Sequence, residues 1–475
     1  MSIPEQNKKN QDTNSNTATT TKTTSTTSKS QEKQEQKPKH KVKGKAYHYY
    51  VESILLDDVP YFLSINLKTG KIETLQSIPT TINILEPLDA NQCGYIPYSF
   101  TSEELHSLIT REISKQEILD DIRNQVEIYI VVDENGKYLI IIDTVLTYCL
   151  EWIHTIHYPF FVGDTESGKS SALHLARWLC YRCHLGEDIP MADIYNFLGT
   201  DEEGCGTIAE DEAQGIYKDR EKIRMYKSSY TKGSRKARIL NTNGPNKHQV
   251  YYHTFCPKWF GGEQIPLDKG FTERLVQVHM ISGTPKSNIK RLTDEEKIRL
   301  NHLRNKLLVW KMQNITKGLQ RFNSGLVQRD QELWEDFLSV AHGTTYFEKA
   351  KEVVKFYTEQ RHQKISDSLE GRIFKIIVKL LDDNLEIMAQ DLWHTIAQGS
   401  EELPGQLDPR QTKSFYPDEF GFKVTMNMLA IMMEEKFHAR KKVRVENYQR
   451  KTYYVFDKDK IKILATKYNV QLNLN

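Results

Sequence analysis

Polar and hydrophobic positions divide the chain into segments of different pattern. Residues 1–45 are rich in Ser, Thr, Gln, Asn and Lys, and Ile3 and Val42 are almost their only branched aliphatic residues. So few apolar side chains do not offset the entropy lost on ordering, which predicts a disordered polar tail. From residue 46 the positions alternate, which predicts a β-rich module over 46–124 that ends in a linking helix. The expected strands and helix are 48–56, 61–67, 72–75 and 101–124.

Two apolar runs on either side of an expected turn come next along the chain, and a segment with helical spacing follows them. Apolar runs at 128–132 and 138–143 flank Glu134-Asn-Gly, a sequence typical of a tight turn, so we expect a β-hairpin. The apolar run 158–162 predicts a buried strand, and helical spacing begins just beyond it. We therefore assign 125–285 to an α/β core and 286–365 to a helical lid or connector.

The last segment, 366–475, shows the order helix, helix, helix and hairpin. This order is typical of a winged helix-turn-helix. The expected helices are 373–381, 387–397 and 423–437, and the expected strands are 443–447 and 452–456.

The most specific motif is Gly163–Ser170, which fits G-x-x-x-x-G-K-[ST] between an expected strand and an expected helix. Glycines let the backbone wrap a phosphate, and a helix N-terminus offers unpaired N–H groups to an anion. Lys169 can reach terminal phosphates, and the Ser170 hydroxyl can hold Mg²⁺. We therefore expect ATP and Mg²⁺ as cofactors. The expected nucleotide-binding residues are Gly163, Asp164, Thr165, Glu166, Ser167, Gly168, Lys169, Ser170 and Ser171.

Hydrolysis also requires an acid that positions Mg²⁺ and a second acid that activates water. A short run ends in Asp211-Glu212, so Asp211 is assigned to the metal, and Glu212 joins Lys169 as a catalytic residue. A rival acid, Asp143, ends a more hydrophobic run but precedes the phosphate loop. We interpret Asp143 as a strand-end capping residue.

Two segments concentrate positive charge, although the formal net charge of the chain is only +2. Residues 218–238 contain nine Lys/Arg and two acids, with Tyr230 among them, a composition suited to phosphate contact and base stacking. Residues 436–462 contain ten Lys/Arg and three acids on the expected third helix and wing. A solvated loop and a protein-docking winged helix are the alternatives to DNA binding. The expected DNA contacts are Lys232, Arg235, Lys236, Arg440, Lys441, Lys442, Arg450 and Lys451.

The order of phosphate loop, Asp-Glu pair, basic loop, Phe255–Gly262 and an arginine before an apolar strand resembles the AAA+-type ATPases of phage, plasmid and archaeal replication. That group includes primase-helicase-like proteins, and the resemblance extends through the expected helical lid. It implies an α/β, AAA+-like P-loop core. It also implies that Thr254 is a nucleotide-state sensor and that Arg274 is a catalytic arginine finger reaching a neighbouring subunit, hence self-association into a ring or other oligomer. A salt-bridged arginine before a core strand is the alternative for Arg274.

Composition places the remaining limits. No run approaches the roughly 20 apolar residues that span a bilayer, and no secretory signal is present, so we expect a cytoplasmic protein without a membrane contact. The six cysteines are scattered, which fits reduced thiols. Cys180-Tyr-Arg-Cys-His184 matches the C-x-x-C-H haem spacing, but we interpret these cysteines as core residues.

Together these features predict an ATP-hydrolysing protein that acts on DNA, as a helicase, translocase or loader in replication. Two alternatives stay open. A small-molecule kinase would turn over ATP only with an acceptor and without regard to DNA. An ATP-sensing DNA-binding regulator would bind ATP without hydrolysing it.

Overall fold

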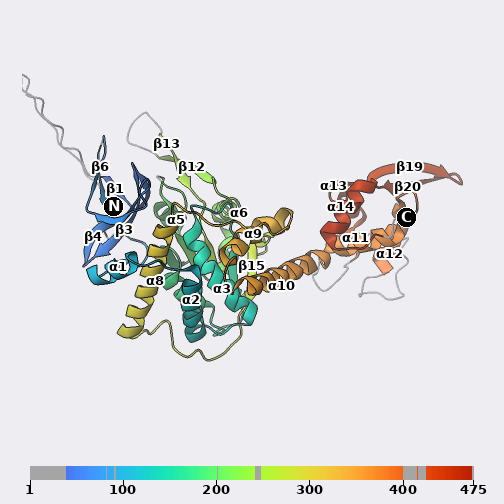
Figure 1. The fold of residues 1–475 in the computed structure, drawn as a ribbon. Helices are drawn as coiled ribbons and strands as arrows, with labels where there is room; N and C mark the ends of the chain where they lie inside the picture. Colours follow the sequence, from blue (N-terminus) through green and yellow to red (C-terminus); the bar gives the residue numbers. More distant parts are fainter. Residues whose placement is uncertain are drawn as a thin grey trace, which may run out of the picture.

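The structure, a computed structural model, describes residues 39–81, 83–89, 93–200, 202–240, 248–398, 414–415 and 424–472. Two large hydrophobic cores organise these residues, one with buried side chains from Tyr50 to Tyr357 and one from Ile373 to Tyr468. We call the corresponding parts the core lobe, residues 39–357, and the C-terminal lobe, residues 369–472. Figure 1 shows the two lobes as separate bodies joined by helix α10 (Phe347–Ser366).

An antiparallel sheet forms the N-terminal module, as the alternating pattern predicts. Four strands pair antiparallel in sequence order, a fifth adds in parallel to one of them, and three others form a small second sheet. The predicted tail is wrong over residues 39–45, which form strands because Lys43 is buried and ion-paired with Glu151 at 2.8 Å. The rest of that tail lies outside the described residues. The strands are β1 Lys39–Lys41, β2 Lys43–Ala46, β3 Tyr49–Leu56, β4 Val59–Asn66, β5 Ile72–Leu75, β6 Ile78–Pro79, β7 Ile84–Pro87 and β8 Ser99–Phe100.

Helices α1 (Ser102–Ile109), α2 (Lys115–Tyr129) and α3 (Glu134–Leu146) connect this module to the central sheet. The predicted hairpin over 128–143 is therefore wrong. Asp133 begins α3 by accepting a hydrogen bond from the N–H of Gly136 at 2.6 Å, and every residue from Leu139 to Leu146 is buried. The run of isoleucines thus reflects a helix covered on all sides, and Asp143 lies inside that helix rather than at a strand end.

Five parallel strands form the central sheet in the order β10-β11-β14-β9-β15. Because all five run in one direction, their carboxyl ends meet at one edge, where ligands of open α/β sheets bind. The strands are β9 Tyr158–Val162, β10 Cys183–Glu187, β11 Thr207–Asp211, β14 Lys258–Gly262 and β15 Leu275–His279. The connecting helices are α4 Lys169–Leu179, α5 Met191–Leu198, α6 Arg220–Ser228 and α7 Lys269–Thr272, with 3-10 turns at Thr147–Cys149 and Ala213–Lys218.

A two-stranded antiparallel ribbon, β12 (Arg235–Leu240) and β13 (His248–His253), is inserted between β11 and β14. The sequence pattern over 250–255 predicts a strand, and β13 occupies most of it. β13 belongs to the ribbon, however, and the central sheet receives the next strand, β14. The ribbon joins the sheet at its amino edge, where the N–H of Thr254 donates to the carbonyl of Ser234 at 3.0 Å.

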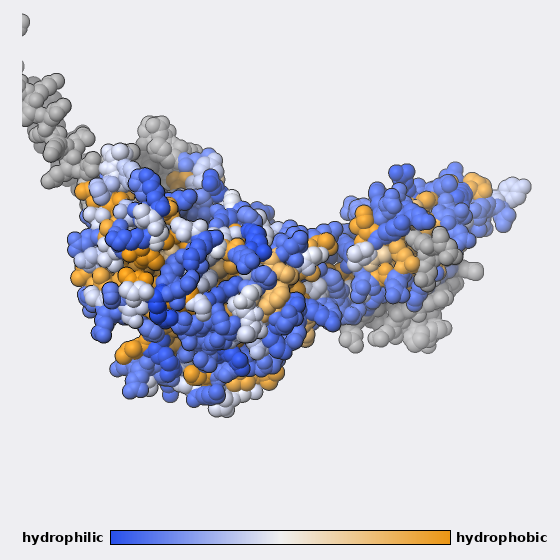
Figure 2. Space-filling model, viewed as in Figure 1, coloured by the Kyte–Doolittle hydropathy of each residue, from blue (hydrophilic) through white to orange (hydrophobic). Residues whose placement is uncertain are grey.

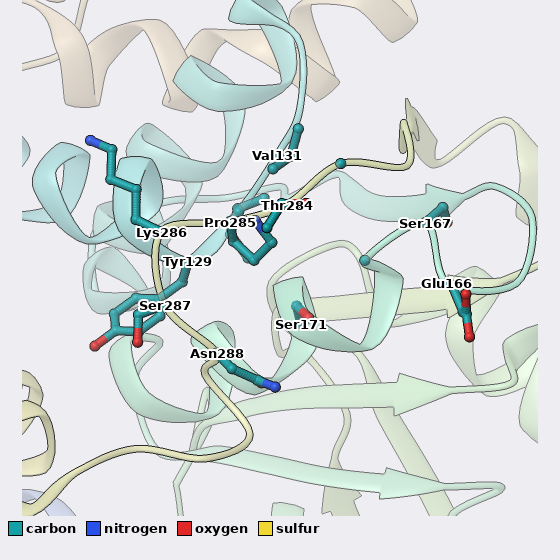
Figure 3. Close-up of a pocket in the computed structure, with 13 residues that line it drawn as sticks. Tyr129, Val131, Glu166, Ser167, Ser171, Thr284, Pro285, Lys286, Ser287 and Asn288 are labelled. Atoms are coloured by element: carbon teal, nitrogen blue, oxygen red, sulfur yellow. The ribbon is translucent and has the colours of Figure 1, made fainter.

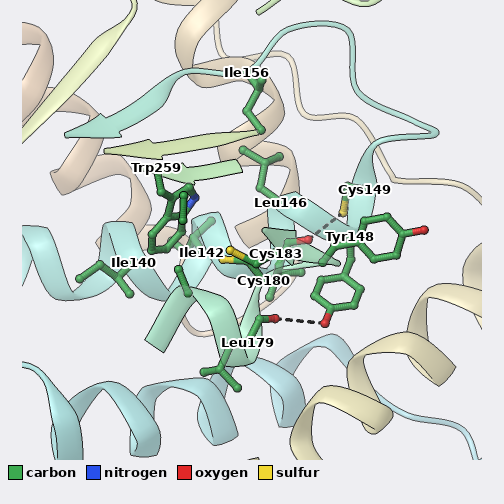
Figure 4. Packing of buried hydrophobic residues seen from close by; sticks show 14 of the residues in the cluster. Ile140, Ile142, Leu146, Tyr148, Cys149, Ile156, Leu179, Cys180, Cys183 and Trp259 are labelled. Atoms are coloured by element: carbon green, nitrogen blue, oxygen red, sulfur yellow. Dashed lines mark hydrogen bonds between the residues drawn. The ribbon is translucent and has the colours of Figure 1, made fainter. Parts of the chain in front are cut away.

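Three long helices close the core lobe: α8 (Asp294–Asn314), α9 (Gln328–Ala341) and α10. α8 packs against α2 and α4, whereas α9 and α10 pack against α3. Figure 4 shows the interior that they cover, where Ile140, Ile142 and Leu146 of α3 lie near the buried Cys180 and Cys183. The segment predicted as a lid or connector therefore packs on the helices that cover the central sheet.

A buried ionic network fixes the N-terminal module to the rest of the core lobe. Glu52 of β3 is fully buried and accepts from Lys311 of α8 at 2.9 Å, from Arg182 at 2.5 Å and from Tyr181 at 2.7 Å. Burial alone would raise the pKa of Glu52, but Lys311 and Arg182 outweigh it and hold the pKa below its ordinary value. Arg182 follows α4, so this network ties the module to the helix that begins at Lys169.

The C-terminal lobe contains three helices and a hairpin in the predicted order, together with one further helix and three short strands. A three-stranded antiparallel sheet, β16-β20-β19, packs with the helices around the second core. Phe374, Leu392, Met433 and Phe437 are among its buried residues. The elements are α11 Leu369–Leu380, β16 Glu386–Met388, α12 Ala389–Gln398, β17 Ser414–Phe415, β18 Val424–Thr425, α13 Met426–Glu435, β19 Arg440–Glu446, β20 Gln449–Val455 and α14 Lys458–Tyr468.

The structure shows the state of the cysteines and the character of the helices. All six cysteines are free, and Cys149, Cys180, Cys183 and Cys256 are buried, as expected for core residues. Within the described ranges no group of three or more His, Cys, Asp or Glu side chains is placed to hold a metal ion. None of the helices in those ranges is long and apolar enough to span a bilayer.

Candidate functional site

The loop Gly163–Gly168 turns from the end of β9 directly into α4 at the carboxyl edge of the central sheet. Gly168 has φ 93°, a left-handed value that favours glycine, and it stands where a capping side chain would otherwise be. The ammonium group of Lys169 folds back across the loop and donates to the carbonyls of Gly163 and Asp164, each at 2.7 Å. The predicted loop and its lysine therefore form one compact turn.

The start of α4 is free to receive an anion. No side chain caps this helix end, and the hydroxyl of Ser167 is buried without a hydrogen-bond partner among the described residues. Exposed N–H groups at a helix N-terminus, together with the helix dipole, favour a phosphate there. The donor set therefore fits phosphate oxygens, and Ser170 in the first helical turn supplies the hydroxyl that a divalent cation would use.

Asp211 and Glu212 lie at the same edge of the sheet. Asp211 is the last residue of β11, and its carboxylate sits close enough to Gly261 of β14 that a Cβ there would lie 2.8 Å from Oδ1. Glu212 follows in a left-handed conformation, φ 54°, and its carboxylate accepts from Gln214 Nε2 at 2.5 Å. The structure thus brings the phosphate loop and the two predicted acids to one side of the sheet.

Two features of this edge were not foreseen from the sequence. Glu263, just beyond β14, accepts a hydrogen bond from the Thr165 hydroxyl at 2.9 Å and so touches the phosphate loop. A cavity of about 430 Å³ opens beside Gly168 and Ser171 (Figure 3), with walls from Tyr129–Val131 and from Gly283–Asn288. Neither wall carries a sequence motif. The cavity forms only because the end of α2 and the loop after β15, which are far apart in the sequence, lie side by side in the fold.

Thr254 lies away from the phosphate loop. It precedes β14, at the amino edge of the parallel sheet, whereas the loop follows the carboxyl end of β9. Its hydroxyl is buried without a hydrogen-bond partner among the described residues. The prediction of Thr254 as a sensor does not fit this position, because the sequence pattern mistook a ribbon strand for a sheet strand.

Arg274 also lies at the amino edge, immediately before β15. Its guanidinium donates to the carbonyl of Gly270 and stacks on the ring of Tyr230, with 4.5 Å from Cζ to the ring centroid. The carbonyl of Arg274 accepts from Tyr158 N–H at 3.0 Å. This packing favours a structural arginine over one that projects toward a neighbouring subunit, although its partners are a carbonyl and a ring rather than the carboxylate of a salt bridge.

The predicted DNA contacts in the first basic segment, residues 218–238, differ in whether they already have hydrogen-bond partners in the fold. The Lys232 ammonium donates to the carbonyls of Leu150 and Glu151 at 3.1 and 2.8 Å, so it does not fit the predicted DNA contact. Burial lowers its pKa. Arg235 is exposed on β12 and Lys236 is half-buried beside it. Of the three predicted contacts in this segment, the two that stay accessible therefore lie on the ribbon, whereas Lys232 in the preceding turn does not.

The second basic segment lies on the β19–β20 hairpin. Arg440, Lys441 and Arg450 are exposed or nearly so and make no ion pair among the described residues. Lys442 lies 3.6 Å from Glu386, and Lys451 lies 3.1 Å from Glu446. All five predicted contacts thus share one hairpin, with three of the five unpaired.

Comparison with known proteins gives distant likenesses only. No family model matches the chain, and no curated protein matches it. Among solved structures, the apo C-terminal region of NrS-1 is 12% identical, covering 86% of this chain and 96% of its own, with a TM-score of 0.39. A structure of JCV helicase with a bound acetamide compound is 12% identical, covering 54% of this chain and 67% of its own, with a TM-score of 0.25. Similarities this low establish neither family nor function, which must rest on the geometry.

Proposed function

We propose that this chain binds and hydrolyses ATP, with Mg²⁺, and uses hydrolysis to act on DNA as a helicase, translocase or loader. The observation that carries the proposal is the uncapped start of α4 beneath the glycine loop, with Asp211 and Glu212 at the same sheet edge. A second support is the pair of cationic hairpins, one in each lobe. An AAA+-like P-loop core with a C-terminal winged helix is the corresponding architecture.

The side chains at the carboxyl edge take distinct roles in this proposal. The loop N–H groups and Lys169 hold the terminal phosphates, and the lysine gives up its two carbonyl partners to reach them. Ser170 and Asp211 would hold Mg²⁺, which neutralises charge on the phosphates when bound. Glu212 accepts a proton from the attacking water. The cavity between Tyr129–Val131 and Gly283–Asn288 would receive the base.

The DNA-binding part rests on Arg235 and Lys236 of the ribbon and on the five cations of the C-terminal hairpin. Each Lys or Arg that neutralises a phosphate releases counterions, so affinity must fall as salt rises. Self-association into a ring remains a prediction, because the packing of Arg274 does not favour its role in trans. Sedimentation velocity with and without ATP tests that prediction directly.

ATP hydrolysis measured with and without single- and double-stranded DNA, at several salt concentrations, tests the proposal. We expect Lys169→Ala and Asp211→Asn to lower the rate by roughly 100-fold or more, because each removes a charge held against the phosphates or metal. Glu187→Gln is the matched control, since Glu187 ends β10 opposite Asp211 and is exposed. Hydrolysis that ignores DNA and is unchanged in Lys169→Ala would overturn the proposal.

Glu212→Gln separates the proposal from the sensor alternative. In a hydrolysing protein the variant should bind ATP normally and lose turnover, because the amide cannot take a proton from water. In a regulator that only senses ATP, ATP-dependent DNA binding should be as strong as in the unmodified chain. The comparison requires both a binding and a turnover measurement on the same preparation.

A further inference from the structure

The β19–β20 hairpin extends well beyond the core of the C-terminal lobe. Seven residue pairs link the strands, from Arg440 with Val455 to Glu446 with Gln449. Near its base Tyr454 is buried, whereas the cross-strand pair of Val445 and Arg450 is exposed. Figure 1 shows the hairpin as an arm that leaves the lobe, and Figure 2 shows this arm as mostly hydrophilic with a hydrophobic patch toward its end.

The arm ends in a turn whose residues are unusual for their backbone. Asn447 and Tyr448 have φ 49° and 63°, the left-handed pair expected of a two-residue hairpin turn. Glycine is the common choice at the second position, because side chains there strain the backbone. Tyr448 has a relative exposure of 104%, so no packing among the described residues compensates for that strain. Non-glycine residues in strained backbone regions cluster at functional sites, so the exposed Tyr448 is a candidate for a ligand contact.

A second tyrosine in a two-residue turn provides a contrast, although only the first position of that turn is left-handed. Tyr47, between β2 and β3, also has a left-handed φ, 54°. Its hydroxyl accepts a hydrogen bond from the N–H of Thr81 at 2.6 Å, so its ring has a partner within the chain. Tyr448 has no such contact with any residue that the structure describes, and six of the sixteen residues from Arg440 to Val455 are Lys or Arg.

The two faces of the arm differ. Val443 and Val445 are exposed on one face, with relative exposures of 55% and 71%, and Arg450 lies opposite Val445. Arg440, Lys442, Arg444 and Lys451 occupy the other face. A cationic arm with an apolar strip that leads to an aromatic tip combines phosphate contact with base stacking, which is the composition that proteins use for single-stranded nucleic acid.

We propose that the arm is a pin that stacks Tyr448 on an unpaired base where duplex DNA opens into single strands. Arg450 and Lys441 hold the adjacent phosphates, and the valine strip contacts the sugar and base edges. A junction is favoured over the interior of a duplex, because stacked neighbours cover the base faces there and an opened base step uncovers one. This inference rests on the proposed action on DNA, but it concerns binding and needs no hydrolysis.

Tyr448→Gly tests the pin with little risk to folding, because glycine accepts the left-handed backbone that tyrosine strains. We expect about tenfold weaker binding to a forked DNA in fluorescence anisotropy without nucleotide. Tyr448→Phe should retain the affinity, since the ring is kept. Binding to blunt duplex and its salt dependence should be unchanged in both variants. Tyr47→Gly is the matched control and should bind the fork as the unmodified chain does.

A 2-aminopurine at the fork gives a second readout, because stacking of an aromatic ring changes its fluorescence. The signal should depend on Tyr448 and not on Tyr47. Equal fork affinity and equal 2-aminopurine signal in Tyr448→Gly would overturn the pin. A change in oligomeric state, with fork binding intact, would also overturn it and make the arm a docking surface for a second copy. Absence of ATP hydrolysis would defeat the proposed function but leave these binding results interpretable.

Discussion

Charged residues serve opposite purposes in the two lobes. In the core lobe Glu52, Lys311 and Arg182 are fully buried and neutralise one another. In the C-terminal lobe Arg440, Lys441 and Arg450 face solvent without an ion-pair partner among the described residues. The same residue types therefore hold modules together where they are buried in ion pairs, and are available to a ligand where they are exposed and unpaired. Local charge density does not distinguish these purposes, whereas burial and partners do.

The largest expected effect comes from the buried network. Glu52→Gln leaves Lys311 and Arg182 buried opposite a neutral amide, which should lower the free energy of unfolding of the core lobe by about 3–5 kcal/mol. Chemical denaturation followed by tryptophan fluorescence measures this. Glu73→Gln in the same module is the control, since its partner Lys71 is largely exposed and the pair is worth at most about 1 kcal/mol. Equal losses for the two variants would contradict the contrast.

Within the first basic segment, Lys232 and Arg235 should behave differently. Lys232→Met leaves the carbonyls of Leu150 and Glu151 without a donor, so stability should fall by about 1–3 kcal/mol while DNA affinity per folded molecule is kept. Arg235→Met should lower DNA affinity and leave unfolding unchanged, because its side chain is exposed. Denaturation and anisotropy on both variants check the pair. A loss of DNA affinity in both Lys232→Met and Arg235→Met would show that Lys232 also contacts DNA.

On the arm, Lys441→Ala and Arg450→Ala should each weaken DNA binding and reduce the slope of log K against log salt by about 0.9, the value for one lost phosphate contact. Lys451→Ala should have a smaller effect, because Lys451 already pairs with Glu446 at 3.1 Å. Anisotropy titrations over a range of salt give the slopes. Identical slopes for all three variants would show that pairing within the arm does not matter.

The smallest effect is a pH dependence. Hydrogen bonds from Arg111, with Lys306 nearby, lower the pKa of Glu117 to about 2. Because the folded pKa lies below the unfolded one, the stability that Glu117 contributes is complete above about pH 5 and disappears as pH falls toward 2. Glu117→Gln should therefore cost under about 1 kcal/mol at pH 7 and converge with the unmodified chain at low pH.

Local motifs were predictable from the sequence because short-range chemistry determines them. Gly163–Ser170 and the alternation over 49–75 depend on neighbours in the chain, and the structure has the expected strand, loop and helix at the first and antiparallel strands over most of the second. The order of three helices and a hairpin in the C-terminal lobe was also predictable from the sequence. These elements have one solvated face, so their periodicity is visible.

Elements that are buried on all sides, or that join across long distances, were not predictable. α3 looks like a strand because its isoleucines are covered everywhere and show no polar face. Thr254 was misplaced because β13 and β14 have similar patterns and only the three-dimensional pairing separates ribbon from sheet. Glu263 and the cavity beside Ser171 arise from loops that meet at the sheet edge, which no local pattern records.

α10 gives the molecule a mechanical property. Its 20 residues make a rod about 30 Å long, anchored on α3 and α9 at one end and on α11 and α14 at the other. A tilt of about 10° at the core end displaces the far end by about 5 Å, more than the 3.4 Å rise between bases along one strand. Any rotation of α10 beside the central sheet would therefore carry the C-terminal hairpin with it.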